Sequence, residues 1–342
     1  MPVKPPATWI VEQLSSRQHD PSSNTSYLTR NGGEVMDFEI KKIAGGIGIE
    51  VLNLDLDEDI SPATQKHLYD AWIDSGIVVF KNMGKSIEHQ IKLSRCFGEL
   101  DIHPVKNLVT NNRHPELMVL ESTAQAQLSI YYRDSKPDHA FVGFIPWHSD
   151  LVFTSNPNHG AMLRAVETPS TGGETAWIDT IAAYDALTAD MKERIEHLEV
   201  EYRFCTSLLD AKFGRDPGLK MRHKGERHFP SFPPVIHPLV WRHPVNGRKI
   251  LNLSPLHLER ITDMDESEST CLLDTLVAHV TNRQFSYIHA WQPDDMVLWD
   301  NWRTLHSALG YPLGDRRLVH RTTIGGDVQR GRIIAESPAL PA

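Results

Sequence analysis

The sequence predicts a mainly β fold, a sandwich or barrel, with a few helices packed on its outside. Three observations predict it. Short apolar segments follow one another from residue 116 onward, glycine and proline turns separate them, and only two stretches with helical spacing interrupt them. Many short strands of this kind are typical of two packed sheets or a closed barrel.

The N-terminal part of the fold alternates strands and helices. Residues 38–56 show apolar alternation broken by Gly-Gly, which predicts two strands. Residues 61–76 begin with Ser-Pro and have helical spacing, so they predict a helix, and the apolar run at 77–80 predicts a strand. Residues 86–100 predict a second capped helix that ends near a glycine.

The rest of the chain is rich in strands. Helical spacing predicts helices at 180–198 and 265–281. The predicted strands lie at 116–122, 160–166, 175–179, 198–204, 237–243, 249–253, 296–300 and 316–325.

We expect one domain over residues 37–332. Residues 1–36 are polar and rich in Pro, Ser and Asn, which predicts a poorly structured arm, and residues 333–342 form a short tail. Two segments, 122–146 and 211–234, are longer than ordinary connections. Each is either a lid that closes over a site or a solvated surface insertion.

Composition excludes several classes of partner. Apolar residues make up 40 % of the 342 residues, and the net charge of −9 favours neither nucleic acid nor an anionic membrane. No apolar run approaches the ~20 residues that span a bilayer, and we expect no signal peptide. The three cysteines are scattered without metal-type spacing, which indicates small buried side chains in a reduced, cytoplasmic protein.

The segment PWHSDLVF places His148 and Asp150 two residues apart. In a strand, such residues project from the same face and can converge on one metal ion. The pattern alone is weak evidence for a metal site, because the chain has 18 histidines and His-x-Glu recurs elsewhere. Such a pair more often lies on the surface or in the core without a metal. A metal would also need a third ligand.

A third ligand is available in His306, which follows the buried strand predicted at 296–300. The next strand carries Arg317 and Arg321, four residues apart and therefore on one face if the strand is regular. Arginines that face the interior are costly unless anions meet them there. The alternative is that both reach a rim and bind water.

Two histidines and one carboxylate leave the opposite side of a metal open. This suits a non-haem Fe(II) oxygenase, although a Zn(II) hydrolase could use the same ligands. The arginines favour the oxygenase, because 2-oxoglutarate is a dianion whose distal carboxylate needs an arginine fork.

Six segments, in their order, resemble the taurine dioxygenase and 2,4-dichlorophenoxyacetate dioxygenase family of Fe(II)/2-oxoglutarate oxygenases. The resemblance spans about residues 37–332 and implies a double-stranded β-helix, a cupin-like jelly roll with flanking helices. The segments are FGELDIHPV, WHSDLVF, ETPSTGGETAWIDTIAAYDAL, HPLVWRHPVNGRK, WQPDDMVLWDNWRTLH and RRLVHRTTIGGD.

The resemblance implies Fe(II) as the metal, held by His148, Asp150 and His306, with 2-oxoglutarate and O2 as co-substrates. It implies oxidative decarboxylation of 2-oxoglutarate to succinate and CO2, coupled to hydroxylation of a C–H bond. Collapse of the product can then cleave a carbon–heteroatom bond. Related halogenases lack the carboxylate ligand, so Asp150 favours hydroxylation.

The same resemblance assigns the 2-oxoglutarate carboxylate to Arg317, helped by the hydroxyl of Thr175 in GGET. Arg321 matches a family arginine near the co-substrate and the substrate anion. His103 matches a histidine that contacts the sulfonate in the taurine enzyme.

Three positions depart from the taurine enzyme. Phe144 aligns with a polar asparagine, Lys106 stands in place of a tyrosine, and His257 stands in place of a pocket phenylalanine. The substrate implied is a larger or more apolar organic acid than taurine, with its acid group near Arg321, His103 and Lys106 or His257. The alternatives without a function are that Lys106 is a solvated surface lysine and that His257 is a loop histidine whose hydrogen bonds are made within the protein.

Two other functions stay open at this point. One is a metal-dependent hydrolase or lyase on the same jelly roll, and the other is a non-catalytic module that binds a small acid. We expect a homodimer or homotetramer, because proteins of the resembled family commonly associate.

Overall fold

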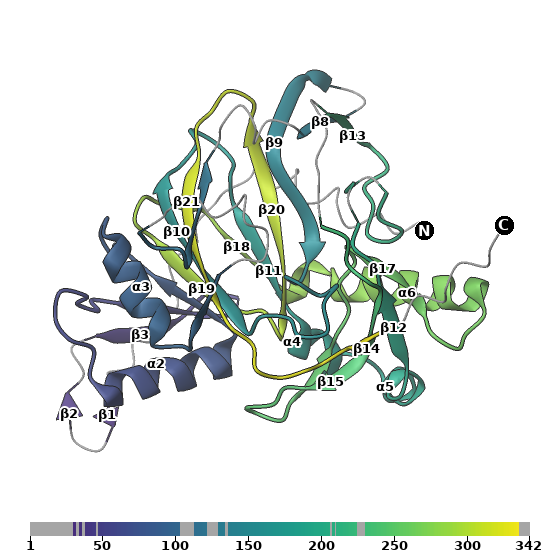
Figure 1. The fold of residues 1–342 in the computed structure, drawn as a ribbon, viewed down its shortest axis with the longest axis horizontal. Helices are drawn as coiled ribbons and strands as arrows, with labels where there is room; N and C mark the ends of the chain where they lie inside the picture. Colours follow the sequence, from purple (N-terminus) through teal and green to yellow (C-terminus); the bar gives the residue numbers. More distant parts are fainter. Residues whose placement is uncertain are drawn as a thin grey trace.

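The computed structural model describes most of the chain, with gaps. The described residues are 30–31, 34–35, 38–45, 47–102, 113–121, 129–133, 136–205, 207–208, 210–223 and 230–334. Two large sheets lie side by side at the centre, and helices cover their outer sides (Figure 1). The predicted mainly β fold with flanking helices is confirmed.

The first sheet has eight strands in the order β3-β4-β5-β19-β10-β21-β6, and β7 also pairs with β21. All of its pairs are antiparallel except β4 with β5. Its strands are β3 (Glu39–Lys42), β4 (Ile49–Leu52), β5 (Ile77–Phe80), β6 (Leu100–Asp101), β7 (Leu117–Glu121), β10 (Gly160–Glu167), β19 (Met296–Asp300) and β21 (Leu318–Ile324).

The second sheet has six antiparallel strands in the order β13-β8-β9-β20-β11-β18. They are β8 (Ser129–Arg133), β9 (Lys136–His148), β11 (Thr175–Asp179), β13 (Leu219–His223), β18 (Ser286–His289) and β20 (Thr304–Pro312). The β9–β20 pairing contains a bulge. His306 is paired with His148 and Ala308 with Ile145, so two steps along β20 correspond to three along β9.

Three small sheets complete the β structure. A four-stranded sheet has the order β17-β12-β14-β22, and two hairpins pair β15 with β16 and β1 with β2. The strands are β1 (Arg30–Asn31), β2 (Glu34–Val35), β12 (Glu199–Tyr202), β14 (Val235–Pro238), β15 (Val240–Arg242), β16 (Lys249–Leu251), β17 (Leu258–Ile261) and β22 (Arg332–Ile333).

The helices begin where their capping residues predict. Ser61 caps α2 and Ser86 caps α3 through their side-chain oxygens, and Gly76 ends α2 in a left-handed conformation. The described helices are α2 (Pro62–Ser75), α3 (Ile87–Arg95), α4 (Thr180–Asp185), α5 (Ala189–Ile195), α6 (Glu266–Val280) and the 3-10 helix η4 (Arg283–Phe285). None of these helices has the length and apolarity needed to cross a membrane.

The single helix predicted at 180–198 is wrong, because the structure has two shorter helices there. Asp179 caps α4, and the N–H of Ala186 closes its last turn. Thr188 then caps α5 by accepting a hydrogen bond from the backbone N–H of Met191. A strong N-cap residue in the middle of a helical pattern starts a new helix.

The prediction of two long loops is also wrong in its described parts. Segment 122–146 contains β8 and most of β9, and segment 211–234 contains β13, which pairs with β8. Residues 122–128, 134–135 and 224–229 lie outside the described part. Sequence spacing missed β13 because its partner β8 lies about 90 residues earlier, whereas β8 and β9 form a local hairpin that was interpreted as a loop.

Of the predicted arm and tail, the structure describes only short pieces. Within residues 1–36 it describes β1 and β2, which pair with each other. Strand β22 crosses the predicted start of the tail and pairs with β14, whereas residues 335–342 lie outside the described part.

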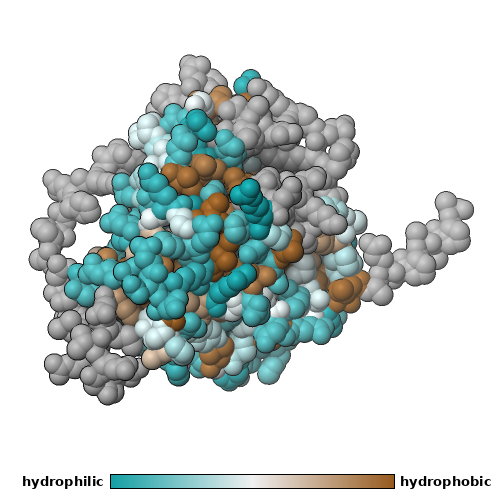
Figure 2. Space-filling view, turned by 60° about the vertical axis from the view of Figure 1, so that its left-hand side comes forward, coloured by the Kyte–Doolittle hydropathy of each residue, from teal (hydrophilic) through white to brown (hydrophobic). Residues whose placement is uncertain are grey.

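Alternating residues divide the core into layers. In β19, Val297 and Trp299 face the space between the two large sheets, whereas Met296 and Leu298 pack under α2 and α3. The outer face of the six-stranded sheet packs against α4 and α6. The face shown in Figure 2 is largely hydrophilic with separate apolar patches. Among the residues that the structure describes, the exposed large apolar side chains, on any face, are Ile102, Ile145, Val245, Leu313 and Ile333.

Candidate metal centre

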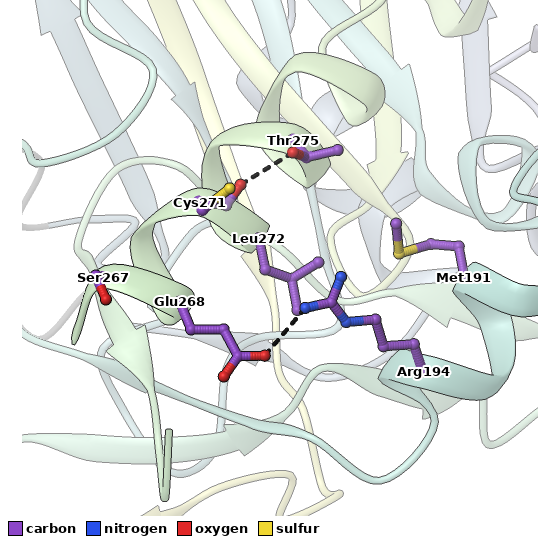
Figure 3. Close-up of a pocket in the computed structure, with 7 residues that line it drawn as sticks. All are labelled: Met191, Arg194, Ser267, Glu268, Cys271, Leu272 and Thr275. Atoms are coloured by element: carbon purple, nitrogen blue, oxygen red, sulfur yellow. Dashed lines mark hydrogen bonds and ion pairs between the residues drawn. The ribbon is translucent and has the colours of Figure 1, made fainter. Parts of the chain in front are cut away.

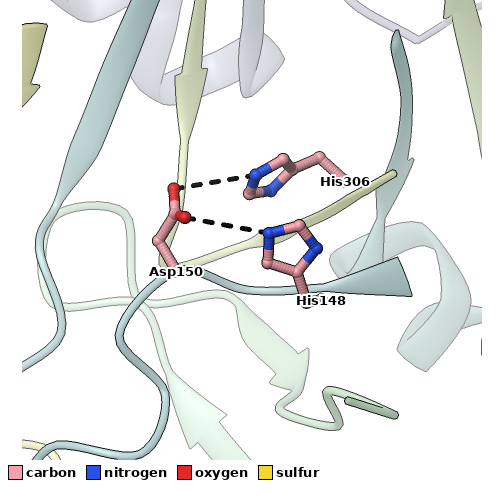
Figure 4. A group of neighbouring side chains, drawn as sticks. All are labelled: His148, Asp150 and His306. Atoms are coloured by element: carbon pink, nitrogen blue, oxygen red, sulfur yellow. Dashed lines mark ion pairs between the residues drawn. The ribbon is translucent and has the colours of Figure 1, made fainter. Parts of the chain in front are cut away.

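His148, Asp150 and His306 lie together between the two large sheets. His148 ends β9 and is paired with His306 on β20, so that their rings are 4.1 Å apart. Asp150 follows in the turn after β9 and points toward both rings (Figure 4). The structure therefore brings together the three residues that the sequence predicted as metal ligands.

The spacing of the three side chains suits a shared ion. Nε2 of His148 lies 3.8 Å from Oδ1 of Asp150, and Nε2 of His306 lies 3.7 Å from Oδ2. These distances are too long for hydrogen bonds. The side chains are only 9–13 % exposed, so a charged group among them needs partners. Two imidazoles and one carboxylate are the donor set of a ferrous facial triad.

Neighbouring groups fix the orientation of the ligands. Nδ1 of His148 lies 2.8 Å from the carbonyl oxygen of Pro146, so a proton on Nδ1 leaves the Nε2 lone pair facing the centre. Asn301 accepts a hydrogen bond from the backbone N–H of Asp150 (2.8 Å) and donates one to its carbonyl oxygen (3.0 Å). Asn301 thus holds the turn that carries the carboxylate.

Electrostatics favour the protonation states that a metal needs. Burial alone would raise the pKa of Asp150, but Arg321 and the two histidines outweigh burial and hold this pKa well below its ordinary value. Burial lowers the pKa of His148 and, together with the nearby His148 ring, lowers that of His306. A carboxylate anion beside two neutral imidazoles is ready to bind a cation.

Arg321 lies on β21 and reaches across to the metal group. Its two terminal nitrogens lie 3.3 and 2.8 Å from the Asp150 carboxylate oxygens, and its guanidinium lies over the Trp299 ring. The neighbouring His320 points to the other side of the sheet and contacts Arg164. Arg321 and His320 therefore project from opposite faces of the sheet.

Arg317 lies just before β21 and forms no ion pair with any residue that the structure describes. Its guanidinium lies 6.0 Å from the centre of the Tyr311 ring, and burial lowers its pKa. A Cβ at Gly173, a glycine with φ +78°, would lie 3.6 Å from Arg317 Cδ. This cation therefore lies against the GGET segment without an anionic partner among the described residues.

Thr175 lies two residues beyond Gly173 and is almost fully buried. It is paired with Ala308, and Trp177 is paired with His306, so Thr175 projects from the same sheet face as His306. Its hydroxyl oxygen accepts a hydrogen bond of 3.0 Å from the indole N–H of Trp291.

His257 belongs to a cluster of aromatic rings beside His148. The cluster consists of Phe153, Phe204, Phe232 and His257, whose ring centres lie 4.6–5.3 Å apart in five pairs. The backbone N–H of Leu256 donates to the carbonyl of Trp147, which places this segment against the end of β9. Burial, with a smaller effect of His148, lowers the pKa of His257 to about 3, so its ring is neutral.

The remaining predicted residues are placed as follows. Phe144 is paired with Leu309, whose side chain points away from the face of His306, and its ring packs against Tyr131. Ile145 is paired with Ala308 and projects toward the metal side instead. The bulge in β9 causes this shift. His103 and Lys106 lie outside the described residues.

A second group of potential ligands is a buried hydrogen-bonded pair with a neighbour. His243 Nε2 lies 2.8 Å from Asp300, whereas His159 Nε2 is 4.0 Å from Asp300. Nδ1 of His243 accepts from the backbone N–H groups of Val245 and Asn246, so Nε2 carries the proton and donates it to Asp300. A protonated Nε2 is not a metal ligand, and we interpret this group as structural.

A surface groove between α5 and α6 lies apart from the metal group (Figure 3). It encloses about 310 Å³, and Met191 and Leu272 supply apolar lining. An ion pair of 3.1 Å joins Arg194 to Glu268 at its edge. The groove contains no histidine and shares no residue with the site.

Sequence reasoning missed three contributors to the site: Asn301, Trp291 and the phenylalanines of the aromatic cluster. Asn301 and Trp291 both lie in the quoted WQPDDMVLWDN segment. Their roles depend on hydrogen bonds to residues more than 100 positions away, which spacing does not reveal.

Comparison with known proteins agrees with this geometry. The family model described as "Taurine catabolism dioxygenase TauD, TfdA family" matches residues 39–323. The (S)-phenoxypropionate/alpha-ketoglutarate-dioxygenase of Sphingobium herbicidovorans is 30% identical over 290 residues, which cover 85% of this chain and 96% of that protein. The alpha-ketoglutarate-dependent 2,4-dichlorophenoxyacetate dioxygenase of Cupriavidus pinatubonensis is 30% identical over 283 residues, covering 81% and 93%.

A solved structure supports the same conclusion. The crystal structure of AAD-2 in complex with Mn(II) and N-oxalylglycine superposes with a TM-score of 0.66 at 27% identity, covering 86% of this chain and all of that one. The predicted jelly roll and the predicted use of Fe(II), 2-oxoglutarate and O2 are thereby confirmed. The chain belongs to the TauD, TfdA family of dioxygenases and is an Fe(II)- and 2-oxoglutarate-dependent dioxygenase.

Proposed function

We propose that this enzyme hydroxylates a C–H bond of an aromatic organic acid, such as an aryloxy carboxylate, and releases succinate and CO2 from 2-oxoglutarate. The observation that carries the proposal is the aromatic cluster of Phe153, Phe204, Phe232 and His257 next to His148. Ring faces and edges of this kind bind a flat aryl group better than a small zwitterion such as taurine.

In this proposal His148, Asp150 and His306 hold Fe(II). The donor set, the burial and the neutral imidazoles all fit that ion. When bound, the iron supplies the redox chemistry that couples O2 to decarboxylation of 2-oxoglutarate and to hydroxylation. The protein contributes orientation and the exclusion of water.

Arg317 and Thr175 bind the distal carboxylate of 2-oxoglutarate. Arg317 supports this role because it is a buried guanidinium without an anionic partner among the described residues. Arg321 binds near the carboxyl groups of 2-oxoglutarate and the substrate, and it also orients Asp150 by two contacts.

His257 positions the substrate as a neutral hydrogen-bond donor. Its Nδ1 accepts the backbone N–H of Cys205 at 2.8 Å, so the ring proton is on Nε2. His103 and Lys106 stay predictions as further substrate contacts, whereas Phe144, on the sheet face opposite His306, is not proposed as one. We also propose a cytoplasmic homodimer or homotetramer, to be tested by sedimentation; the three free cysteines fit a reducing setting.

A substrate panel tests the proposal. Purified enzyme with Fe(II), 2-oxoglutarate and air is offered aryloxy acids, alkyl sulfates, aryl sulfonates and taurine, and succinate is measured. We expect at least one aromatic acid to exceed taurine by tenfold or more in kcat/KM. A preference for taurine or for an unbranched alkyl sulfate would overturn the aromatic assignment.

An anaerobic experiment tests the reaction class separately. Fe(II) with 2-oxoglutarate should give the weak visible absorption of a chelated keto acid. A metal-dependent hydrolase or a non-catalytic acid-binding module would stay colourless and release no succinate in air.

A further inference from the structure

The hydroxyl of Thr175 has a fixed direction. The indole N–H of Trp291 can only donate, so the hydroxyl oxygen of Thr175 is the acceptor of their 3.0 Å hydrogen bond. The hydroxyl proton of Thr175 is then left to donate elsewhere. Among the described residues no acceptor for it is present, and the guanidinium of Arg317 lies against Gly173 on the same segment.

Trp291 is itself held by a chain of buried polar groups. Its ring meets the His289 ring edge to face, with centres 4.7 Å apart. The hydroxyl of Tyr287 lies 2.8 Å from Nδ1 of His289, whose Nε2 lies 3.1 Å from Asp295. The ammonium group of Lys81 lies 2.8 Å from the same carboxylate. The chain thus runs from the protein surface to the threonine.

Each proton in this chain has one consistent placement. Lys81 only donates, so the Asp295 carboxylate accepts, and Nε2–H of His289 donates to it as well. Nδ1 of His289 then accepts the proton of the Tyr287 hydroxyl. The imidazole is neutral, because burial lowers the pKa of His289. Because both nitrogens of His289 form hydrogen bonds, its ring cannot rotate. The surface on which Trp291 packs therefore stays in place.

We propose that Trp291 is a positioning residue for 2-oxoglutarate. By occupying the acceptor side of the Thr175 hydroxyl, it turns the hydroxyl proton toward the distal carboxylate that Arg317 binds. The proposal rests on the proposed binding of 2-oxoglutarate at Thr175 and Arg317. It adds that the hydroxyl donates only because the indole N–H is present.

A double-mutant cycle tests this proposal. The dissociation constant of 2-oxoglutarate is measured by calorimetry with Mn(II) in place of Fe(II), so that no turnover consumes the ligand. We expect Thr175→Val to weaken 2-oxoglutarate about tenfold, as for a lost hydrogen bond to a charged group, and Trp291→Phe to weaken it about fivefold. In the double variant, Trp291→Phe should add no further loss, because the hydroxyl through which it acts is gone.

Three controls separate positioning from general damage. Trp72→Phe removes another fully buried indole, which packs in the separate apolar cluster under α2, and should leave the 2-oxoglutarate affinity unchanged. Thr175→Ser keeps the hydroxyl and should bind 2-oxoglutarate nearly as wild type does. The Mn(II) affinity should be the same in all of these variants.

A ligand comparison localises the effect. 2-Oxopentanoate has a methyl group where 2-oxoglutarate has its distal carboxylate, so Thr175→Val should not weaken it. If Trp291→Phe does not fold, Tyr287→Phe removes the hydrogen bond to His289 and should weaken 2-oxoglutarate by about twofold.

The outcomes distinguish the two levels of the hypothesis. If the wild type binds no 2-oxoglutarate with Mn(II), both the proposed site and the role of Trp291 are overturned. If the wild type binds it and Trp291→Phe binds it equally well, or if the losses from the two substitutions add in free energy, only the role of Trp291 is overturned.

Discussion

The Asp150 carboxylate lies between two neutral imidazoles and a guanidinium. It faces the two imidazoles that we assign to the metal, and it also pairs with the guanidinium of Arg321. The arginine keeps the carboxylate ionised in a buried place, and Asn301 holds its backbone from behind. A metal ligand with this many fixed neighbours binds in one geometry.

We expect Asp150→Ala to lose hydroxylation and to weaken Mn(II) binding at least 100-fold, because only two neutral ligands remain. Metal affinity is measured by calorimetry. Asp274→Ala, on the exposed side of α6, is the matched control and should bind Mn(II) normally. Unchanged succinate production by Asp150→Ala would refute the ligand assignment.

We expect Arg317→Ala to raise the KM for 2-oxoglutarate by about 100-fold, because the distal carboxylate loses the guanidinium that binds it. Steady-state kinetics with 2-oxoglutarate and with the primary substrate varied in turn measure this. Arg316→Ala removes the adjacent arginine, which pairs on the surface with Glu121, and should have little effect. If primary-substrate binding collapses instead, the roles of Arg317 and Arg321 are exchanged.

At the scale of the element, the turn from β19 to β20 supports the site. Asp300 begins the turn, and its carboxylate receives hydrogen bonds from His243 and from the backbone N–H of Trp302. Asn301 comes next and reaches Asp150. His159 stacks on Trp302 with ring centres 3.8 Å apart. The buried Asp300–His243 pair thus holds the turn in place, and from this turn Asn301 reaches Asp150.

The His159 ring, which stacks on this turn, should make the stability of the folded protein depend on pH. Burial lowers the pKa of His159 to about 4, from an ordinary value of 6.5. Between these values the unfolded chain binds a proton at His159 that the folded chain does not. The free energy of unfolding therefore has its full value, as far as His159 is concerned, above pH 6.5 and falls as the pH drops toward 4. We expect His159→Phe to reduce the slope of unfolding free energy against pH by about 1.4 kcal/mol per unit.

Urea unfolding of metal-free protein from pH 4.5 to 7.5 measures that slope. His197→Gln, at an exposed position, should leave it unchanged. An unaltered slope in His159→Phe would show that other groups cause the pH dependence.

For the whole molecule, the site connects the two large sheets. His148 and His306 belong to the six-stranded sheet, whereas Arg321 and Trp299 belong to the eight-stranded sheet. The layer between the sheets also contains Trp177 and Trp291. A metal bound here therefore stabilises the packing of one sheet on the other.

Metal removal should lower the melting temperature. A ligand at about 100 times its Kd adds about 2.7 kcal/mol to the unfolding free energy, so Mn(II) should raise Tm by several degrees over the chelator-treated protein. Differential scanning fluorimetry measures the shift. The Asp150→Ala variant should show almost none, and an equal shift in that variant would place the bound metal elsewhere.

The sequence predicted the parts of the molecule that depend on short-range pattern. Ser61 and Ser86 mark the starts of two helices, and the His-x-Asp motif with His306 named three side chains that the structure brings together. Strand β13 was missed because its partner β8 is distant in the chain, whereas the β8–β9 hairpin was missed although its two strands are adjacent. Regular alternation would place Phe144 on the same face as His148, four residues later, but the bulge puts it on the opposite face.

The bulge in β9 also limits how this enzyme can change in length during evolution. Trp147 packs in the core outside the six-stranded sheet, whereas its neighbour His148 faces inward beside His306. Deleting Pro146 would remove the bulge and leave Ile145 and His148 on one sheet face, whereas inserting a residue here would turn one of these two side chains to the opposite face. Insertions in this family are therefore expected at the tips of surface hairpins such as β15–β16 rather than in this four-residue stretch.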